Sequence, residues 1–555
     1  MEENKYNNNA GKTTRFIPVI IAVSIVVGIL IGTFYANHFS GNRLSIINTS
    51  SNKLNDLLRI IDDKYVDTVS MSDLVEEAMP QILAELDPHS TYIPAKDVEA
   101  SNADLKGHFS GIGVSFTIQQ DTICINNVIQ GGPSEKVGLI PGDRIVTVDD
   151  SLFVGKKVTN EAAMGKLKGE KGTTVKLGIK RAGVKDLLSF SIVRGDIPVK
   201  SVDCYYMLTD NIGYIKIKRF AETTYAETMI AIATLDQKGC KALVIDLRGN
   251  VGGYLGTAVQ TINEFLPKNR LIVYTEGRKS PREEFRSDGR GTNQKTPLVV
   301  LTDEISASAS EIFAGAIQDN DRGTIIGRRT FGKGLVQQPI DFRDGSSMRL
   351  TIARYYTPSG RCIQKPYVRG QGAEYEYDIM NRFNHGEFFS EDSIRQNTKE
   401  VYHTSIGRTV YGGGGIMPDI FVPQDTTGYT SYYMACVNTG VYVEFGFQYT
   451  DKNREKLKEY KNEKELADYL KRQNLLEQFV RFAETRGIKR RNLMIRKSRA
   501  LLEQLIYGSV INYALDFGDY IEYLNETDPT VLKAIDVINK GEAFPKPPVK
   551  AEKKQ

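Results

Sequence analysis

The chain has 555 residues, too many for one hydrophobic core, so we expect three or four domains. Hydrophobic residues make up 41% and charged residues 25% of it, both ordinary for globular protein. The formal net charge of +4 comes from 72 basic and 68 acidic residues, a near balance that gives no reason to expect a nucleic-acid partner. The five cysteines are scattered without a CxxC pair, which predicts neither a metal site nor a disulfide framework.

The beginning of the chain has the pattern of a membrane anchor. A polar, basic tail at residues 1–15 precedes an uncharged apolar run at residues 16–36. A helix of that length spans about 30 Å, the thickness of the hydrocarbon core of a bilayer. Basic residues before the run place the tail in the cytoplasm, and Phe34-Tyr35-Ala36 is a poor cleavage site for signal peptidase. The sequence therefore predicts an uncleaved single-pass anchor in the inner membrane, with the rest of the chain in the periplasm.

A linker and a helical region are predicted next. Residues 37–53 are mostly polar, which is typical of a linker. Within residues 54–100, apolar side chains recur at helical spacing as far as Leu86 and predict two packed helices. His89 follows in an Asp-Pro-His-Ser sequence, where a turn histidine capped by Asp87 is favoured over a catalytic one.

Residues 107–195 contain two glycine-rich stretches in a characteristic order. SGIGVSF, at Ser110–Phe116, can present successive backbone N–H groups to a terminal carboxylate. Gly131–Asp150 predicts a short helix that leads through Pro-Gly-Asp into a strand. The two stretches together resemble a PDZ domain, which implies that a peptide's free C-terminus binds here as an added edge strand. An ordinary β-domain with a glycine turn is the alternative. The implied contacts are Gly111, Ile112, Gly113 and Val114.

Residues 200–427 alternate strands and helices. Strands are predicted at Ile212–Phe220 and, ending in a glycine turn, at Lys241–Gly253, with a helix at Thr223–Leu235 between them. Within this region, residues 365–408 are polar and lack apolar periodicity. They predict an inserted loop with mostly solvated side chains.

One unit of this region places a candidate nucleophile near a candidate base. An apolar strand at Pro297–Glu304 precedes a predicted helix at Ser306–Asp319. A serine at such a turn lies beside N–H groups that no carbonyl uses, at the positive end of the helix dipole, where an oxyanion can be held. Ser308 and Glu311 also have the capping-box spacing, so Ser308 could simply cap the helix.

Lys333 lies between two glycines, after a second apolar strand at Gly323–Arg329. Burial can lower a lysine pKa from about 10.4 towards roughly 7–8, and a neutral lysine can take the proton of a serine. No histidine lies in the unit, which favours Ser–Lys over Ser–His–Asp chemistry. A turn with a solvated lysine is the alternative.

SASASEIFAGAIQD, followed by GRRTFGKGLVQQ, resembles the catalytic segment of the carboxy-terminal processing, or tail-specific, serine proteases. The resemblance extends over about residues 54–425. It implies that Ser308 is the nucleophile, Lys333 the base and Gln337 the residue that orients the lysine. It also implies that no metal or cofactor is needed.

The stretch KALVIDLRGNVGG resembles a second element of that family, Asp-Leu-Arg-x-Asn-x-Gly-Gly. The resemblance implies an oxyanion hole formed by the N–H of Gly252 or Gly253 together with that of Ala309. The family commonly has proline where this chain has Val251, a departure that should alter the stiffness of the turn and not its chemistry.

Residues 428–542 are helical in pattern, and residues 543–555, rich in proline and lysine, predict a disordered tail. A basic cluster at Arg486–Arg499 is interspersed with apolar residues that suit helix packing, so it predicts a solvated helix face and not a nucleic-acid site. This region could form a homo-oligomer or recruit an adaptor.

Together these features predict a multidomain α/β and α+β protein: a membrane helix, a PDZ domain, a mixed α/β protease core of the crotonase/ClpP type and a helical C-terminal region. The predicted function is a periplasmic serine endopeptidase that recognises protein C-termini and works through an acyl-enzyme. A non-catalytic PDZ scaffold is the first alternative. An acyl-CoA enzyme of crotonase-like fold, which would share the oxyanion glycines, is the second.

Overall fold

The computed structural model describes residues 25–29, 43–119 and 121–548. The predicted membrane segment at 16–36 lies outside the described residues except for 25–29, and residues 549–555 of the predicted tail lie outside them too. Among the helices that are described, none combines the length and the apolar character needed to cross a bilayer. The chain forms two compact units, residues 1–82 and 83–555.

In the first unit, a helix replaces most of the predicted linker. Helix α2 (Arg43–Lys64) begins well inside residues 37–53, and α3 (Met71–Ala84) follows it. The linker prediction relied on serine and asparagine content. Neither glycine nor proline occurs between Gly41 and Lys64, so the part of the predicted linker after Gly41 contains no residue that strongly disfavours a helix.

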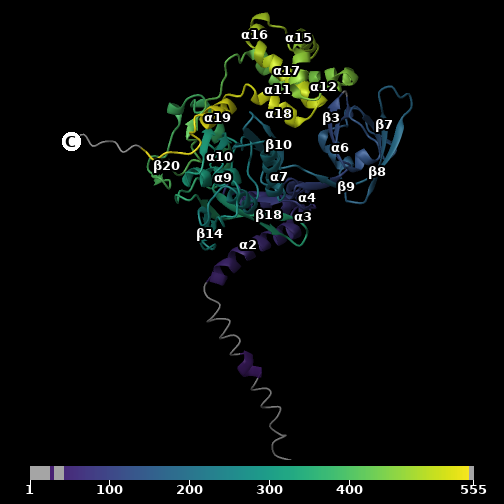
Figure 1. The fold of residues 1–555 in the computed structure, drawn as a ribbon. Coiled ribbons are helices and arrows are strands. Elements are labelled where there is room, and N and C mark those ends of the chain that lie inside the picture. Colours follow the sequence, from purple (N-terminus) through teal and green to yellow (C-terminus); the bar gives the residue numbers. More distant parts are fainter. Residues whose placement is uncertain (1–24, 30–42, 120, 549–555) are drawn as a thin grey trace, which may run out of the picture. The chain divides into compact units, whose positions relative to one another are not determined.

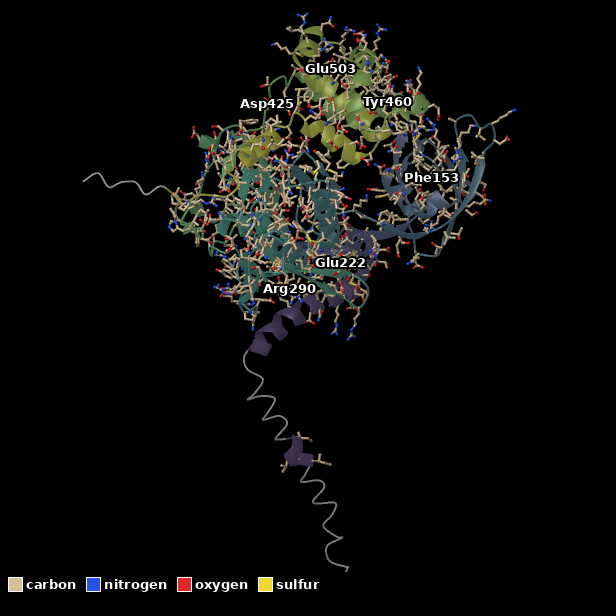
Figure 2. All side chains as sticks on the ribbon, viewed as in Figure 1. Phe153, Glu222, Arg290, Asp425, Tyr460 and Glu503 are labelled. Carbon is tan, nitrogen blue, oxygen red and sulfur yellow. The ribbon has the colours of Figure 1, made fainter. Side chains whose placement is uncertain are left out.

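The PDZ region is an antiparallel sheet closed by short helices. Its strand order is β3-β4-β5-β7-β8, with β6 paired to β5, so β3 lies at an edge. Ile123, Ile145 and Leu177 are fully buried in its core, and Phe153, labelled in Figure 2, packs at the rim of that core. The elements are β2 (His108–Gly111), β3 (Val114–Gln119), β4 (Thr122–Val128), α5 (Pro133–Lys136), β5 (Arg144–Val148), β6 (Ser151–Leu152), α6 (Asn160–Leu167), β7 (Thr174–Lys180), β8 (Leu188–Val193) and β9 (Gly195–Pro198), the last paired with β2.

The central sheet of residues 200–427 has the order β10-β11-β12-β15-β16-β21. Neighbouring strands in this sheet are parallel, except for β10 and β11, which are antiparallel. A parallel sheet needs cover on both faces, and β12 is accordingly buried along its whole length. Its strands are β10 (Val202–Met207), β11 (Ile212–Ile217), β12 (Ala242–Asp246), β15 (Leu298–Thr302), β16 (Thr324–Gly327) and β21 (Ile420–Phe421).

Helices from distant parts of the chain cover the two faces of this sheet. Leu243, Ile245 and Val300 face a core shared with α7 (Thr224–Gln237), α8 (Leu255–Asn263) and α9 (Ala309–Asp319). The alternate side chains Val244, Val299 and Leu301 face a second core that includes α19 (Pro529–Asn539). Helix α19, yellow in Figure 1, therefore packs on the central sheet, although residues 428–542 were predicted to form a separate helical region. Arg248, just after β12, donates to Asp528 at the start of α19 (2.7 Å).

A second, antiparallel sheet has the order β1-β18-β13-β14, with β17 paired to β18. The pairing of β17 with β18 begins at Leu335, shortly after Lys333, and Leu335 lies opposite Arg354. The sheet therefore fixes the segment that follows the candidate base. Its strands are β1 (Thr91–Ile93), β13 (Leu271–Glu276), β14 (Glu283–Arg286), β17 (Leu335–Asp341) and β18 (Ser347–Tyr356), and α4 (Ala95–Lys106) follows β1.

Residues 365–408 are folded, so the prediction of an inserted loop is wrong. The segment contains α10 (Gly372–Asn384), a 3-10 turn at Glu391–Ser393 and β19 (Val401–His403), which pairs with β20 (Thr409–Tyr411). Tyr375 and Arg382 of α10 are 3% and 5% exposed. They lie at helical spacing, but the charged residues between them obscure the pattern.

The remaining helices form a separate core around Phe479, Leu502 and Ile506, in the region of Tyr460 and Glu503 in Figure 2. They are α11 (Ser431–Thr439), α12 (Val441–Lys452), α13 (Arg454–Leu457), α14 (Glu463–Lys471), α15 (Leu475–Thr485), α16 (Asn492–Lys497), α17 (Arg499–Ala514) and α18 (Phe517–Asn525). The predicted tail starts too early, because Ala543 is buried and its carbonyl accepts from Thr324 (3.1 Å).

Candidate active site

Ser308 lies in the sharp turn between β15 and α9. Its φ is +57°, a left-handed conformation that costs a non-glycine residue about 1–3 kcal/mol. Its backbone N–H donates to Glu311 Oε2 (2.9 Å), one turn into the helix. Ser308 and Glu311 therefore form the capping interaction that their spacing predicts. Ser308 does more than cap the helix, however, because it also lines a cleft.

Glu311 ties the serine turn to the lysine loop. It is fully buried and also accepts from the backbone N–H groups of Gly332 (2.7 Å) and Lys333 (2.8 Å). Burial raises the pKa of this carboxyl to about 7, and the hydrogen bond from the Thr330 hydroxyl leads those that oppose the rise. Sequence reasoning identified Glu311 only as a capping partner. Its bonds to a loop across the site carry no local sequence signal.

Lys333 projects from that loop into the same cleft as Ser308. Its Nζ donates to Gln337 Oε1 (3.1 Å), so the two residues predicted to work as base and orienter are in contact. Burial, followed by the positive charge of Arg349, lowers the pKa of the Lys333 ammonium. An amine with a lowered pKa is a better proton acceptor near neutral pH.

Gln337 is held in turn by the Asp-Pro-His-Ser turn. Its Nε2 donates to the backbone carbonyl of His89. The His89 N–H donates to Asp87 Oδ1 (2.9 Å), which confirms the predicted cap. The His89 ring contacts the hydroxyl of Tyr375 on α10 (Nε2 to O, 2.9 Å), and burial lowers the pKa of the imidazole to about 4. His89 is thus a neutral structural residue behind the lysine.

The glycine turn after β12 closes against the serine. A Cβ on Gly252 would lie 2.7 Å from Ser308 Cβ, and one on Gly253 would lie 2.1 Å from the carbonyl oxygen of Phe220. The N–H of Gly252 already donates to Asn250 Oδ1 (2.8 Å). The N–H groups of Gly253 and Ala309 donate to none of the residues that the structure describes. Of the three predicted oxyanion donors, these two are available.

Two cavities adjoin the candidate dyad. A cleft of about 460 Å³ is lined by Ser308 and Lys333 and includes Arg219 and Arg349 but no acidic residue. A smaller pocket of about 240 Å³ lies on the other side of Lys333 and has mostly apolar walls. Ile379 of α10 contributes to it, so the segment predicted as a loop forms part of the site. The other residues lining the smaller pocket are His89, Val251, Ile305, Ala307 and Phe331.

The predicted peptide-binding loop of the PDZ region lies between β2 and β3. Ile112 is buried at 2% exposure, and Gly113 has a φ of +78°. Their carbonyls accept from Ser134 (3.0 Å) and Ile129 (3.0 Å), whereas their N–H groups donate to no residue in the described part of the chain. Gly111 ends β2 and Val114 begins the edge strand β3. A glycine turn that offers N–H groups beside an open edge can receive a carboxylate and then a strand.

Family models match three parts of the chain. Peptidase family S41 matches residues 211–372, a PDZ domain matches residues 110–192, and a family of unknown function matches residues 432–516.

Individual proteins are similar over longer stretches. A carboxy-terminal-processing protease of Bartonella bacilliformis is 38% identical over 319 residues, which is 56% of this chain and 72% of that protein. The carboxy-terminal processing protease CtpA of Bacillus subtilis is 34% identical over 358 residues, 64% of this chain and 76% of that protein. Among solved structures, a photosystem II D1 C-terminal processing protease is 28% identical, with a TM-score of 0.32, and the match covers 56% of this chain and 89% of that one.

Proposed function

This chain belongs to the S41 family of carboxy-terminal processing serine proteases, and on that premise we propose that Ser308 and Lys333 are its catalytic dyad. The observation that carries the proposal is the partly buried Lys333 Nζ, bonded to Gln337 Oε1 at 3.1 Å in the cleft that Ser308 also lines. Burial and the charge of Arg349 outweigh the nearby carboxylates and lower the pKa of this ammonium, which favours the deprotonated amine.

In the proposed reaction, Ser308 Oγ attacks the carbonyl carbon of the scissile peptide while Lys333 Nζ takes the hydroxyl proton. The N–H groups of Gly253 and Ala309 stabilise the negative oxygen that forms. The C–N bond then breaks, and the proton on Lys333 passes to the departing amine. Water attacks the resulting ester with Lys333 again accepting the proton, which releases the product acid and restores Ser308.

The remaining parts of the site suggest how a substrate is chosen. The smaller pocket beside Lys333 has apolar walls, which suits an apolar side chain of the substrate. The loop at Gly111–Val114 and the edge strand β3 support capture of a free C-terminus by the PDZ domain. We place this activity outside the cytoplasm, behind an N-terminal anchor, on the strength of the uncharged run at residues 16–36.

The test uses the full chain, purified in detergent, and an unfolded protein substrate with an apolar C-terminus. Mass spectrometry should show cleavage by the parent and a loss of at least about 10³-fold in kcat for Ser308→Ala and for Lys333→Ala. Converting the substrate's terminal carboxylate to an amide should raise KM. Binding of the substrate without cleavage by the parent would instead support the non-catalytic scaffold.

A further inference from the structure

Tyr355 places a hydroxyl in the catalytic cleft that the dyad does not use. It comes from β18, and its backbone N–H donates to the carbonyl of Gly334, the residue after Lys333 (3.0 Å). Its side chain is only 2% exposed, lines the cleft with Ser308 and Lys333, and brings its hydroxyl beside the Ser308 side chain. The ring is thus fixed by the same loop that carries the candidate base.

The Tyr355 hydroxyl is among the buried polar atoms that lack a hydrogen-bond partner of normal geometry in the described part of the chain. Leaving a buried hydroxyl unpaired costs about 1–3 kcal/mol, so such groups need an explanation beyond folding. A phenylalanine would fill the same space without that cost. Burial also raises the pKa of this phenol well above its ordinary value, which keeps the proton on the oxygen.

We propose that the Tyr355 hydroxyl donates a hydrogen bond to Ser308 Oγ and positions it for attack. With one lone pair of Oγ occupied in this way, the serine proton is directed away from the tyrosine, towards Lys333. As Lys333 removes that proton, negative charge grows on Oγ, and a fixed donor stabilises a developing anion more than it stabilises the resting hydroxyl. Tyr355 is therefore a positioning residue for the nucleophile and is distinct from the two oxyanion donors. This inference rests on the proposed function.

The chain offers a matched control in Tyr432. This residue of α11 is also 2% exposed, and its hydroxyl also lacks a partner among the described residues. It lies beside the thiol of Cys436 in the core of the helical region and not beside a catalytic group. Replacing either tyrosine by phenylalanine removes one buried hydroxyl and keeps the ring.

The experiment compares Tyr355→Phe and Tyr432→Phe in the full chain. Both variants should keep or slightly raise the melting temperature. Only Tyr355→Phe should lower kcat, by about tenfold to a hundredfold with KM unchanged, because the lost bond is stronger in the transition state. An unchanged kcat for Tyr355→Phe in an active parent would overturn the inference, and so would equal losses in both variants.

A second measurement removes peptide binding from the comparison. A small fluorophosphonate forms an Oγ–P bond with an activated serine as the P–F bond breaks, fluoride leaves and the serine proton passes to Lys333. Tyr355→Phe should slow labelling of Ser308 by a factor similar to the loss in kcat, whereas Tyr432→Phe should not. If the parent itself neither labels at Ser308 nor cleaves substrate, the proposed function fails. If the parent does both and Tyr355→Phe matches it, only the role of Tyr355 fails.

Discussion

Two glycine turns in this molecule leave backbone N–H groups without an acceptor among the described residues, yet they are built differently. The turn at Gly111–Val114 in the PDZ domain offers its N–H groups beside an open strand edge, where a carboxylate that is already charged can bind. The turn at Asn250–Gly253 leaves the N–H of Gly253 without a described acceptor in the cleft that Ser308 also lines, where in the proposed reaction charge exists only transiently. The first suits binding of a ground state, and the second suits stabilisation of a transition state.

The space around the two turns differs accordingly. A Cβ on Gly253 would meet the backbone of Phe220 at 2.1 Å, which has no room to move. A Cβ on Gly113 would meet the end of the Ile197 side chain at 3.0 Å, and the nearest backbone atom lies 3.8 Å away. The catalytic turn is therefore closed by backbone on its far side, whereas the PDZ turn is bordered by side chains. Substitution should separate the two roles.

The largest effect is expected for Gly253→Ala. The new methyl group forces the turn away from Phe220 and moves the N–H that we assign to the oxyanion, so kcat should fall by at least about 10²–10³-fold. Gly256→Ala is the control, because a Cβ there meets nothing within 4 Å. Steady-state kinetics and a melting curve would measure both. Normal kcat in a folded Gly253→Ala protein would contradict the assignment of the oxyanion hole.

A smaller effect is expected for Gly113→Ala. Alanine pays about 1–2 kcal/mol to adopt the left-handed conformation of Gly113, which should disturb the nest and raise KM about tenfold for substrates with a free C-terminus. Labelling of Ser308 by a fluorophosphonate should be unchanged. Gly183→Ala is the control, since Gly183 has the same φ of +78° with open space around it. If both variants raise KM alike, backbone strain and not the nest is responsible.

The smallest effect concerns the pH dependence of the catalytic side. The proposed dyad needs neutral Lys333, so activity should rise as pH increases through the pKa of this lysine. The charge of Arg349 contributes to lowering that pKa. Arg349→Gln should therefore raise the pKa and move the acidic limb of the kcat profile to higher pH, with the plateau retained. Arg349→Lys keeps the charge and should restore the limb, and an unshifted limb in Arg349→Gln would show that burial alone sets the pKa.

The proposed dyad could be identified from sequence because its parts lie on short, strongly patterned elements. The strands at β15 and β16 are apolar throughout, and Ser308, Lys333 and Gln337 fall at the spacing of a known family. These residues were identified by resemblance to that family. Their local patterns alone also fit a helix cap at Ser308 and a turn with a solvated lysine at Lys333.

What could not be predicted depends on contacts between distant segments. Glu311 is recognisable as a helix cap, but its bonds to Gly332 and Lys333 arise only when the loop folds over the helix. The apolar face of α10 is hidden by its charges, and Ile379 became part of a pocket only through tertiary packing. Nothing in the sequence distinguishes Tyr355 from its neighbours, because its significance comes from the buried position of its hydroxyl beside Ser308.

The packing of α19 against the central sheet has a consequence for how the protein is made. Every strand of that sheet precedes α19 in the chain, so during synthesis one face of the sheet stays uncovered until this helix has emerged. Burying side chains such as Val531 and Val537 is worth about 1.5–3 kcal/mol each, a gain that the nascent core lacks until then. Asp528 also accepts a hydrogen bond from Arg248, which precedes the turn at Asn250–Gly253. A chain synthesised to just short of Asp528 would therefore contain Ser308 and Lys333 but lack this contact. The order of the sequence thus leaves this face of the central sheet without its helical cover until α19 has been synthesised.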